Sequence, residues 1–197
     1  MRVLILCEYS GRVRDAFIRK GHNAISCDFL PTESDLGPHW QGDCQAMLYQ
    51  HYDLIIAHPP CTALTVAGNG TYGEGKACYQ KRLDAAKWTE ELWLKCLDKA
   101  SKVCFENPVG VLPRLTCIPK ATYVHPWMFG HMEQKKTGLH LHNLPSLIET
   151  DNVREEMLKL PEKERCRLHW LPPGPNRWKL RSTTFVGIAE AMANQWG

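Results

Sequence analysis

The residue best suited to covalent chemistry is Cys61, which ends the run His58-Pro59-Pro60-Cys61. This run follows the apolar stretch Asp53–Ala57, and its two prolines fix the backbone that presents the thiol. A cysteine held in this way can act as a nucleophile once it is a thiolate, although most lone cysteines are buried and inert. The glycine-rich segment Ala67–Lys76 comes next and is typical of a loop that closes over a substrate.

A carboxyl group follows another apolar stretch, Lys102–Phe105, in the tripeptide Glu106-Asn107-Pro108. A carboxylic acid that is partly removed from water stays protonated and can donate a hydrogen bond to a ring nitrogen. Asn107 could hold this loop through backbone hydrogen bonds. The alternative is an ordinary turn at the end of a strand, which Asn-Pro favours.

Strands and helices alternate in the first half of the chain and would position these groups. Buried strands are predicted at Arg2–Cys7, Asn23–Cys27, Asp53–Ala57 and Lys102–Phe105. Helices are predicted over Gly11–Lys20, capped by Ser10, and over Tyr79–Ala100. After residue 110 we expect strands at Thr122–His125 and Thr137–His142, helices at Val153–Leu160 and Phe185–Gln195, and a loop over Leu171–Arg181.

This pattern predicts an α/β fold with a mostly parallel sheet and helices on both faces. We expect one domain over residues 1–197 with a short irregular insertion near residues 143–181. Ligands of such sheets bind at the carboxyl ends of the strands. The segments that fall there are Cys7–Gly11, Asp28, His58–Cys61 and Glu106–Pro108.

Two aspartates and the first turn bear on a cofactor. Asp28 ends the second strand and could accept hydrogen bonds from a ribose diol, or could stabilise a turn. Asp43 could reach an adenine amino group, or could cap the next helix. The turn Cys7–Gly11 offers a single glycine, so it would cradle a pyrophosphate poorly and suits a cofactor without phosphates.

Composition is that of a globular protein, with 44% hydrophobic and 23% charged residues, which excludes disordered and fibrous classes. No apolar run reaches the roughly 18 residues of a membrane helix, and the early charge in the first segment argues against a secretory signal. The nine cysteines, an odd number, indicate free thiols in a reducing cytoplasm. A structural zinc held by Cys96, Cys104, Cys117 and nearby histidines is an alternative.

The net charge of +3 is unevenly distributed, because Arg165–Arg181 holds five basic and no acidic residues. Trp170 and Trp178 lie between these cations. Cations interleaved with aromatic rings fit a polyanion that carries stackable bases. A solvated basic loop anchored to the core by its tryptophans is the alternative.

Together these segments resemble the C5-cytosine DNA methyltransferases, and among them the compact methyltransferase-like proteins of bacteriophages and prophages. The family carries a Pro-Cys nucleophile after one strand and a Glu-Asn-Val tripeptide after the next, which match Pro60-Cys61 and Glu106-Asn107-Pro108. Gln134-Lys135-Lys136 is similar to the family's Gln-x-Arg-x-Arg segment. The resemblance covers nearly the whole chain in order and implies a Rossmann-like methyltransferase fold.

The resemblance also implies a role for each matching residue. Cys61 would attack C6 of a cytosine flipped out of DNA, Glu106 would contact N3 and the exocyclic amine, and Lys136 would support the site or a phosphate. S-adenosylmethionine is the implied cofactor, with Asp28 at its ribose and Asp43 at its adenine. The other implied cofactor contacts are Cys7, Glu8, Tyr9, Ser10, Gly11, Phe29, Cys44 and Pro59. Implied DNA contacts are Pro60, Asn107, Arg177, Lys179 and Arg181.

The implied partner is DNA, met in the cytoplasm of a bacterium or a phage-infected host, without a membrane. The short region between Asn143 and Arg181 predicts relaxed target specificity, or help from a second subunit or a second copy. Departures from the family are the first turn, the second arginine of its Gln-x-Arg-x-Arg segment, which falls at Gly138, and Ser182-Thr183-Thr184 in place of a Gly-Asn.

Several other activities remain open at this point. Amino-group methyltransferases carry an Asp/Asn-Pro-Pro-aromatic tetrapeptide, which His58–Cys61 half matches, and RNA C5-cytosine methyltransferases carry a second cysteine where Glu106 stands. The same thiol adduct would also serve transfer of another one-carbon group. A catalytically silent DNA-binding relative is an alternative from another class, and a hydrolase that pairs Cys61 with His58 lacks an orienting acid.

Overall fold

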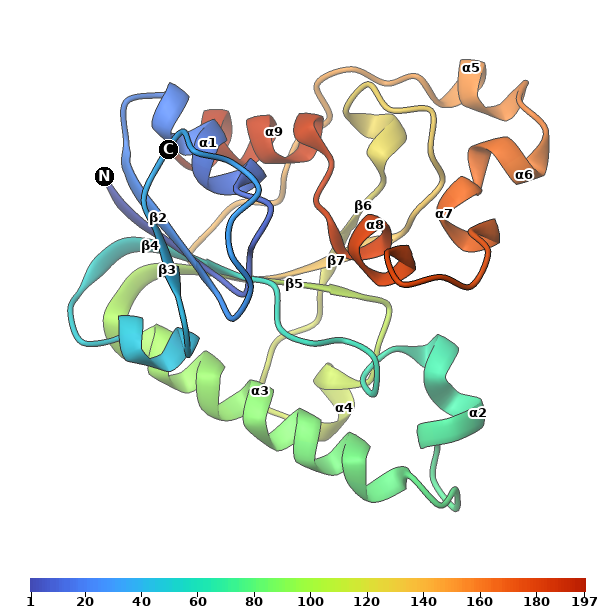
Figure 1. Cartoon of the computed structure of the whole chain (residues 1–197), viewed down its shortest axis with the longest axis horizontal. Coiled ribbons are helices and arrows are strands. Elements are labelled where there is room, and N and C mark those ends of the chain that lie inside the picture. Colours follow the sequence, from blue (N-terminus) through green and yellow to red (C-terminus); the bar gives the residue numbers. More distant parts are fainter.

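A computed structural model describes residues 1–197 and contains one seven-stranded sheet (Figure 1). The strand order is β3-β2-β1-β4-β5-β7-β6, and only β7 runs antiparallel to its neighbours. The strands are β1 (Arg2–Leu6), β2 (Asn23–Asp28), β3 (His39–Gln41), β4 (Tyr52–Ala57), β5 (Ala100–Pro108), β6 (Thr122–Val124) and β7 (Thr137–His142). The predicted α/β architecture with a mostly parallel sheet is confirmed.

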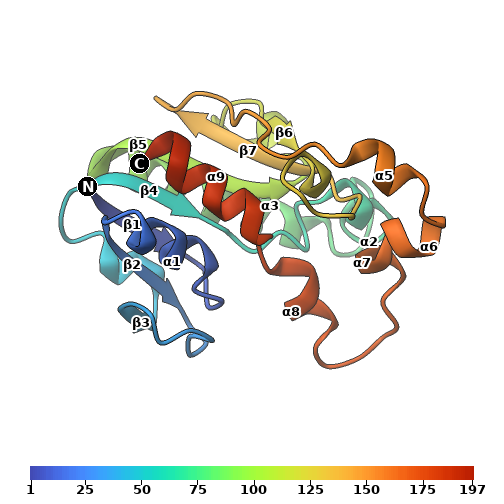
Figure 2. The same cartoon turned by 90° about the horizontal axis from the view of Figure 1, so that it is seen from above.

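Helices cover both faces of the sheet. The long ones are α1 (Arg12–Arg19), α3 (Tyr79–Lys99) and α9 (Val186–Trp196). The short ones are α2 (Asn69–Tyr72), α4 (Leu112–Leu115), α5 (Arg154–Leu158), α6 (Glu162–Arg165), α7 (Arg167–Trp170) and α8 (Arg177–Ser182). Single 3₁₀ turns are η1 (Cys44–Met47), η2 (Val66–Gly68) and η3 (Pro126–Met128). Figures 1 and 2 show α1 and α9 side by side on one face, with α3 on the other.

Successive side chains of the central strands point to opposite faces of the sheet, so each face has its own hydrophobic core. In β1, Leu4 and Leu6 pack toward α3, whereas Val3 and Ile5 pack toward α1 and α9. All four are buried, as expected for a central strand covered on both faces. The two cores fix the sheet rigidly, and its carboxyl edge carries the candidate site.

The structure departs from the sequence-based elements in several places, and the short helices α2, α4, α6 and α7 were not predicted. The edge strand β3 was not predicted, because its three residues are polar or exposed. The loop predicted over Leu171–Arg181 is wrong in its second half, where α8 forms. The N-cap position of α1 is Gly11 rather than Ser10, although the Ser10 hydroxyl accepts a hydrogen bond at 3.3 Å from the amide of Arg12, the first residue of the helix. No helix in the structure has the length and apolar character needed to cross a membrane.

Candidate active site

The pairing of β4 with β5 places the two chemically important segments side by side. These strands are parallel, and Ala57 pairs with Phe105 as the last matched residues. His58 begins the loop after β4, whereas Glu106 is still part of β5 and pairs with Leu139 of β7, so the strand predicted to end at Phe105 continues to Pro108. His58 Nδ1 lies 3.2 Å from Glu106 Oε2, and both side chains are largely buried. The carboxyl edge thus brings together the segments His58–Cys61 and Glu106–Pro108, as the sequence predicts.

Hydrogen bonds join the segment that contains Cys61 to the end of β5 and the residues that follow it. Asn107 is buried, and its side-chain amide donates to the Pro59 carbonyl at 3.4 Å. Further along, backbone bonds join Val66 to Val109 and Val111 to Leu64. Asn107 therefore has the loop-holding role expected of it, and Pro59 is buried beside it while Pro60 is exposed.

Cys61 is partly buried, and its carbonyl accepts from the amides of Leu64 and Thr65 in a tight turn. Burial and the negative charge of Glu106 raise the pKa of the Cys61 thiol above its usual value. The positive charges of Lys135 and Arg181 lower it in part. The thiol and the carboxyl group thus interact electrostatically, and the resting cysteine is a thiol.

Glu106 is ionised, and the prediction of a protonated Glu106 is wrong. Burial alone would raise the pKa of this carboxyl group. The hydrogen bond from His58 and the charge of Lys135 outweigh burial, so the net effect lowers the pKa of Glu106. The sequence-based reasoning considered burial and omitted these two partners.

The cation beside this pair is Lys135 rather than its neighbour Lys136. Lys135 Nζ donates to the Arg181 carbonyl at 2.9 Å, and its charge acts on both Cys61 and Glu106. Lys136 Nζ lies 4.2 Å from the centre of the Tyr123 ring. The structure therefore does not bring Lys136 to the candidate pair.

Arg82 anchors the segment that follows Cys61, and sequence reasoning missed it. Its buried guanidinium donates to the carbonyl of Ala63 at 2.7 Å, to Asn69 Oδ1 at 2.8 Å and to the carbonyl of Thr65 at 3.1 Å. The glycine-rich segment is partly helical, as η2 and α2. A signal was present in the sequence, because Arg82 shares the buried face of α3 with Ala86, Thr89 and Trp93.

The turn after β1 supplies its own helix cap. Glu8 is buried, and its carboxylate accepts from the amides of Val13 at 2.8 Å and Arg14 at 3.4 Å. Ser10 donates its hydroxyl to Glu8 Oε1. The positive end of α1 is therefore occupied by a carboxylate of the protein itself, and a phosphate would meet repulsion there.

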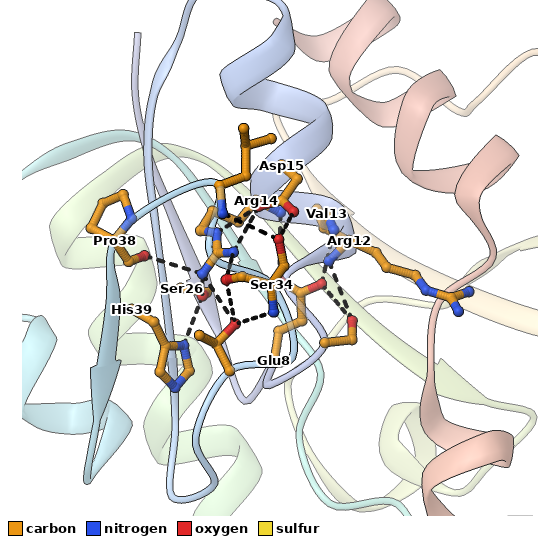
Figure 3. Close-up of polar contacts among 12 residues, drawn as sticks. Glu8, Arg12, Val13, Arg14, Asp15, Ser26, Ser34, Pro38 and His39 are labelled. Carbon is orange, nitrogen blue, oxygen red and sulfur yellow. Dashed lines mark hydrogen bonds and ion pairs between the residues drawn. The ribbon is translucent and has the colours of Figure 1, made fainter.

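Arg14 holds the segment between β2 and β3 in place through hydrogen bonds, as Figure 3 shows. This arginine is completely buried and pairs with Asp15 at 2.8 Å. Its guanidinium also donates to the Ser26 hydroxyl and to the Ser34 carbonyl. His39 Nδ1 joins the same Ser26 hydroxyl at 2.8 Å. This network holds the chain that lies beyond Asp28.

The predicted cofactor residues gather near the carboxyl end of β2. Asp28 Oδ1 accepts from the Leu30 amide at 2.9 Å, which leaves Oδ2 without a protein partner. Phe29 beside it is 73% exposed. A contact with Cys44, together with burial, raises the pKa of Cys7, whose backbone has a φ of 56°. Asp43 is exposed and caps η1 through the Gln45 amide.

Helix α8 contacts the first turn, which follows β1, through Tyr9. Tyr9 donates its hydroxyl to the Lys179 carbonyl at 3.2 Å, and its ring lies 5.8 Å from that of Trp178. Lys179 pairs with Glu33 at 3.5 Å. Arg177 donates to the carbonyls of residues 169 and 171, so its charge serves the local fold.

Two features of the basic segment remain free for a ligand. The Arg181 side chain is exposed and has no protein hydrogen-bond partner. Trp170 and Trp178 are each about half exposed, so neither is a fully buried core anchor. Lys163 Nζ lies 6.0 Å from the centre of the Trp170 ring and Lys179 Nζ lies 5.8 Å from that of Trp178, so cations and aromatic rings are adjacent on this surface.

The zinc alternative is contradicted by the positions of its cysteines. Cys96 lies in the core between the sheet and α3, whereas Cys104 lies in the core on the opposite face. No group of three or more histidine, cysteine or acidic side chains could hold a metal ion. All nine cysteines are free.

The strand order, the antiparallel β7 and the helical layers define a Rossmann-like α/β fold. No protein-family model and no curated protein matches the chain. Among solved structures, the chain is similar to a protein described as a DNA modification methyltransferase encoded within a prophage of E. coli. The two share 13% identity with a TM-score of 0.46, over 82% of this chain. The chain covers 56% of that protein.

Proposed function

We propose that the protein is a DNA cytosine C5-methyltransferase that acts through a covalent bond between Cys61 and C6 of a flipped-out cytosine. One observation carries the proposal. The register of β4 and β5 puts the Cys61 loop and Glu106 of β5 at one edge, where the charge of Glu106 acts on the thiol. A thiol beside an acid is what C5 chemistry needs, because the ring carbon has no lone pair with which to attack an electrophile.

Each residue of the pair has a defined task in this reaction. Cys61 loses its proton and forms the sulfur–C6 bond, which pushes electrons toward N3 and makes C5 nucleophilic. The Glu106 carboxyl group faces N3 and the exocyclic amine. S-adenosylmethionine supplies the electrophilic methyl group when it is bound. Loss of the C5 proton then breaks the sulfur–C6 bond and restores the aromatic ring.

Residues near the first turn fit this cofactor. The free Oδ2 of Asp28 can accept from a ribose hydroxyl, and the exposed ring of Phe29 can stack on adenine. Glu8 occupies the positive end of α1, which disfavours a cofactor with phosphates and suits one that has none. Asp43 has an exposed carboxylate within the same region, in keeping with the adenine amino group.

DNA is the proposed substrate, and the region 143–181 is its proposed contact surface. Arg181 offers an unpaired guanidinium whose charge also acts on Cys61, so a phosphate bound there would lie close to the nucleophile. Lys135, rather than Lys136, is the proposed supporting cation at the site. The small size of this region supports a short target sequence, or a second subunit that completes the surface.

Covalent trapping tests the proposal directly. DNA containing 5-fluorocytosine, incubated with the protein and S-adenosylmethionine, should give a complex that survives denaturing electrophoresis, because fluorine at C5 cannot leave as a proton. Cys61→Ser should abolish the complex, whereas the control Cys117→Ser, at an exposed thiol, should not. Mass spectrometry of nucleosides should then show 5-methylcytosine with the wild-type protein. An unaltered yield of 5-methylcytosine from Cys61→Ser would reject the nucleophile.

A further inference from the structure

The His58 side chain is buried in an unusual way for a residue in a loop. Only 8% of it is exposed, and Nδ1 lies 3.2 Å from Glu106 Oε2. The other ring nitrogen, Nε2, is buried and has no hydrogen-bond partner. An unpaired buried polar atom costs about 1–3 kcal/mol. A histidine kept in such a position at the carboxyl edge calls for a role beyond packing.

The charged groups around His58 and Glu106 affect the ionisation of the Glu106 carboxyl group. Lys135 and His140 both act on Glu106 through their charges and favour its ionised form. The negative charge of Glu106 acts on Cys61 and Cys104. Together with burial, this charge raises the pKa of both cysteines and favours their thiol forms. Among these neighbours, His58 is the group with an N–H directed at the carboxylate.

The addition reaction requires a proton that ionised Glu106 does not carry. When sulfur bonds to C6, N3 of cytosine gains electron density and must be protonated. Glu106 faces N3 in the proposed function, but its hydrogen bond and cationic neighbour keep it ionised. A donor behind it is therefore needed, and a histidine is the side chain suited to this task near neutral pH.

We propose that His58 is a positioning residue that orients Glu106 and supplies the proton that Glu106 delivers to cytosine N3. This inference rests on the proposed function. In the imidazolium form, the Nδ1–H bond breaks as the Oε2–H bond forms, and that proton then passes to N3. His58 is left neutral with its remaining proton on Nε2. The thiol proton of Cys61 leaves to water, and both transfers reverse when the sulfur–C6 bond breaks.

Three variants separate proton supply from simple positioning. His58→Asn keeps an N–H close to the position of Nδ1 but cannot give up a proton. His58→Gly leaves a space that added imidazole can fill. His51→Asn, at an exposed histidine, is the matched control. The measurement is the rate of covalent complex formation with 5-fluorocytosine DNA, with and without imidazole, between pH 5.5 and 8.5.

The expected result is a loss of about 10²–10⁴-fold for both His58 variants, as for removal of a general acid. Imidazole should restore the rate of His58→Gly at least tenfold and should not restore the rate of His58→Asn. As a readout apart from the reaction, carbon-13 NMR should show a higher pKa for Glu106 in His58→Gly, because burial is then less opposed.

Two results overturn the inference and are distinguishable. If His58→Asn forms the complex at the wild-type rate, or if imidazole rescues neither variant, His58 supplies no proton, while the proposed function stands. If the wild-type protein forms no complex and no 5-methylcytosine, the proposed function fails and the inference fails with it. Comparison of the thermal unfolding of all three variants with wild type verifies that each is folded.

Discussion

Replacement of Arg82 by methionine tests whether this residue holds the segment that presents Cys61. Methionine keeps much of the side-chain volume and removes three hydrogen bonds, to the carbonyls of Ala63 and Thr65 and to Asn69 Oδ1. Asn69 is exposed, so water can replace its lost partner. The expected cost therefore comes from the two carbonyls, which lie in a partly buried turn.

The Ala63 carbonyl is left without a partner, which costs about 1–3 kcal/mol. The Thr65 carbonyl keeps its bond from the Gly68 amide, so the loss of its second bond costs about 1 kcal/mol. The free energy of unfolding should therefore fall by about 2–4 kcal/mol. For a domain of this size, roughly 2–4 °C is lost per kcal/mol, which gives a fall in Tm of about 4–16 °C. Misplacement of the thiol by about 1 Å would slow complex formation with 5-fluorocytosine DNA by about 10²-fold.

Urea denaturation, thermal unfolding and hydrogen exchange measure these effects. Exchange should accelerate in residues 61–69 and remain unchanged in β1. Lys81→Met is the matched control, because Lys81 is the exposed neighbour of Arg82 on α3, and it should change stability by no more than about 0.5 kcal/mol. The reasoning is refuted if Arg82→Met unfolds with the same free energy as Lys81→Met and exchanges residues 61–69 at the same rate.

Three further outcomes follow from the same contacts. Arg14→Met should lower the free energy of unfolding by about 3–5 kcal/mol in urea denaturation, since it leaves the buried Asp15 carboxylate without its cation and with only the Ser34 hydroxyl as a partner, whereas Arg19→Met at an exposed site should have little effect. Burial raises the pKa of Cys27 to about 12, so the folded chain keeps this proton longer than the unfolded chain. The free energy of unfolding should therefore fall as pH rises above about 9, and it should fall less in Cys27→Ala. Equal slopes of the free energy of unfolding against pH in the two proteins would contradict this. Arg181→Ala should reduce the slope of log K against log salt for DNA binding by about 1, and an unchanged slope would remove this residue from the interface.

The strands that carry the site were predictable because they are buried on both faces. Uniform apolar runs at β1, β4 and β5 identify them, and the rule that parallel strands end at one edge brings Cys61 near Glu106. Short polar elements carry no such signal. The edge strand β3 contains His39, Trp40 and Gln41, and its pairing with β2 depends on tertiary contacts.

Predictions about single side chains depended on geometry that a sequence does not contain. Lys135 and Lys136 are adjacent, and successive side chains in extended chain point to opposite sides, so only the register of the approach to β7 decides which one faces Glu106. Ser10 has the residue type of a cap and accepts from the Arg12 amide, but two further free amides of α1 bind the Glu8 carboxylate. The ionisation of Glu106 depends on His58, which is distant in sequence.

The charges at the site imply that the nucleophile is activated by its substrate rather than in advance. Burial and Glu106 raise the pKa of Cys61, so the resting thiol has little thiolate and reacts slowly with general electrophiles. A phosphate bound at Arg181 would partly neutralise the positive charge that lowers the pKa of Cys61. The remaining source of activation is the base itself, because its entry draws a proton from His58 to Glu106, and the carboxyl group beside the sulfur is neutral while it holds that proton. Nucleophile and acid are then activated by one event, the entry of cytosine between them.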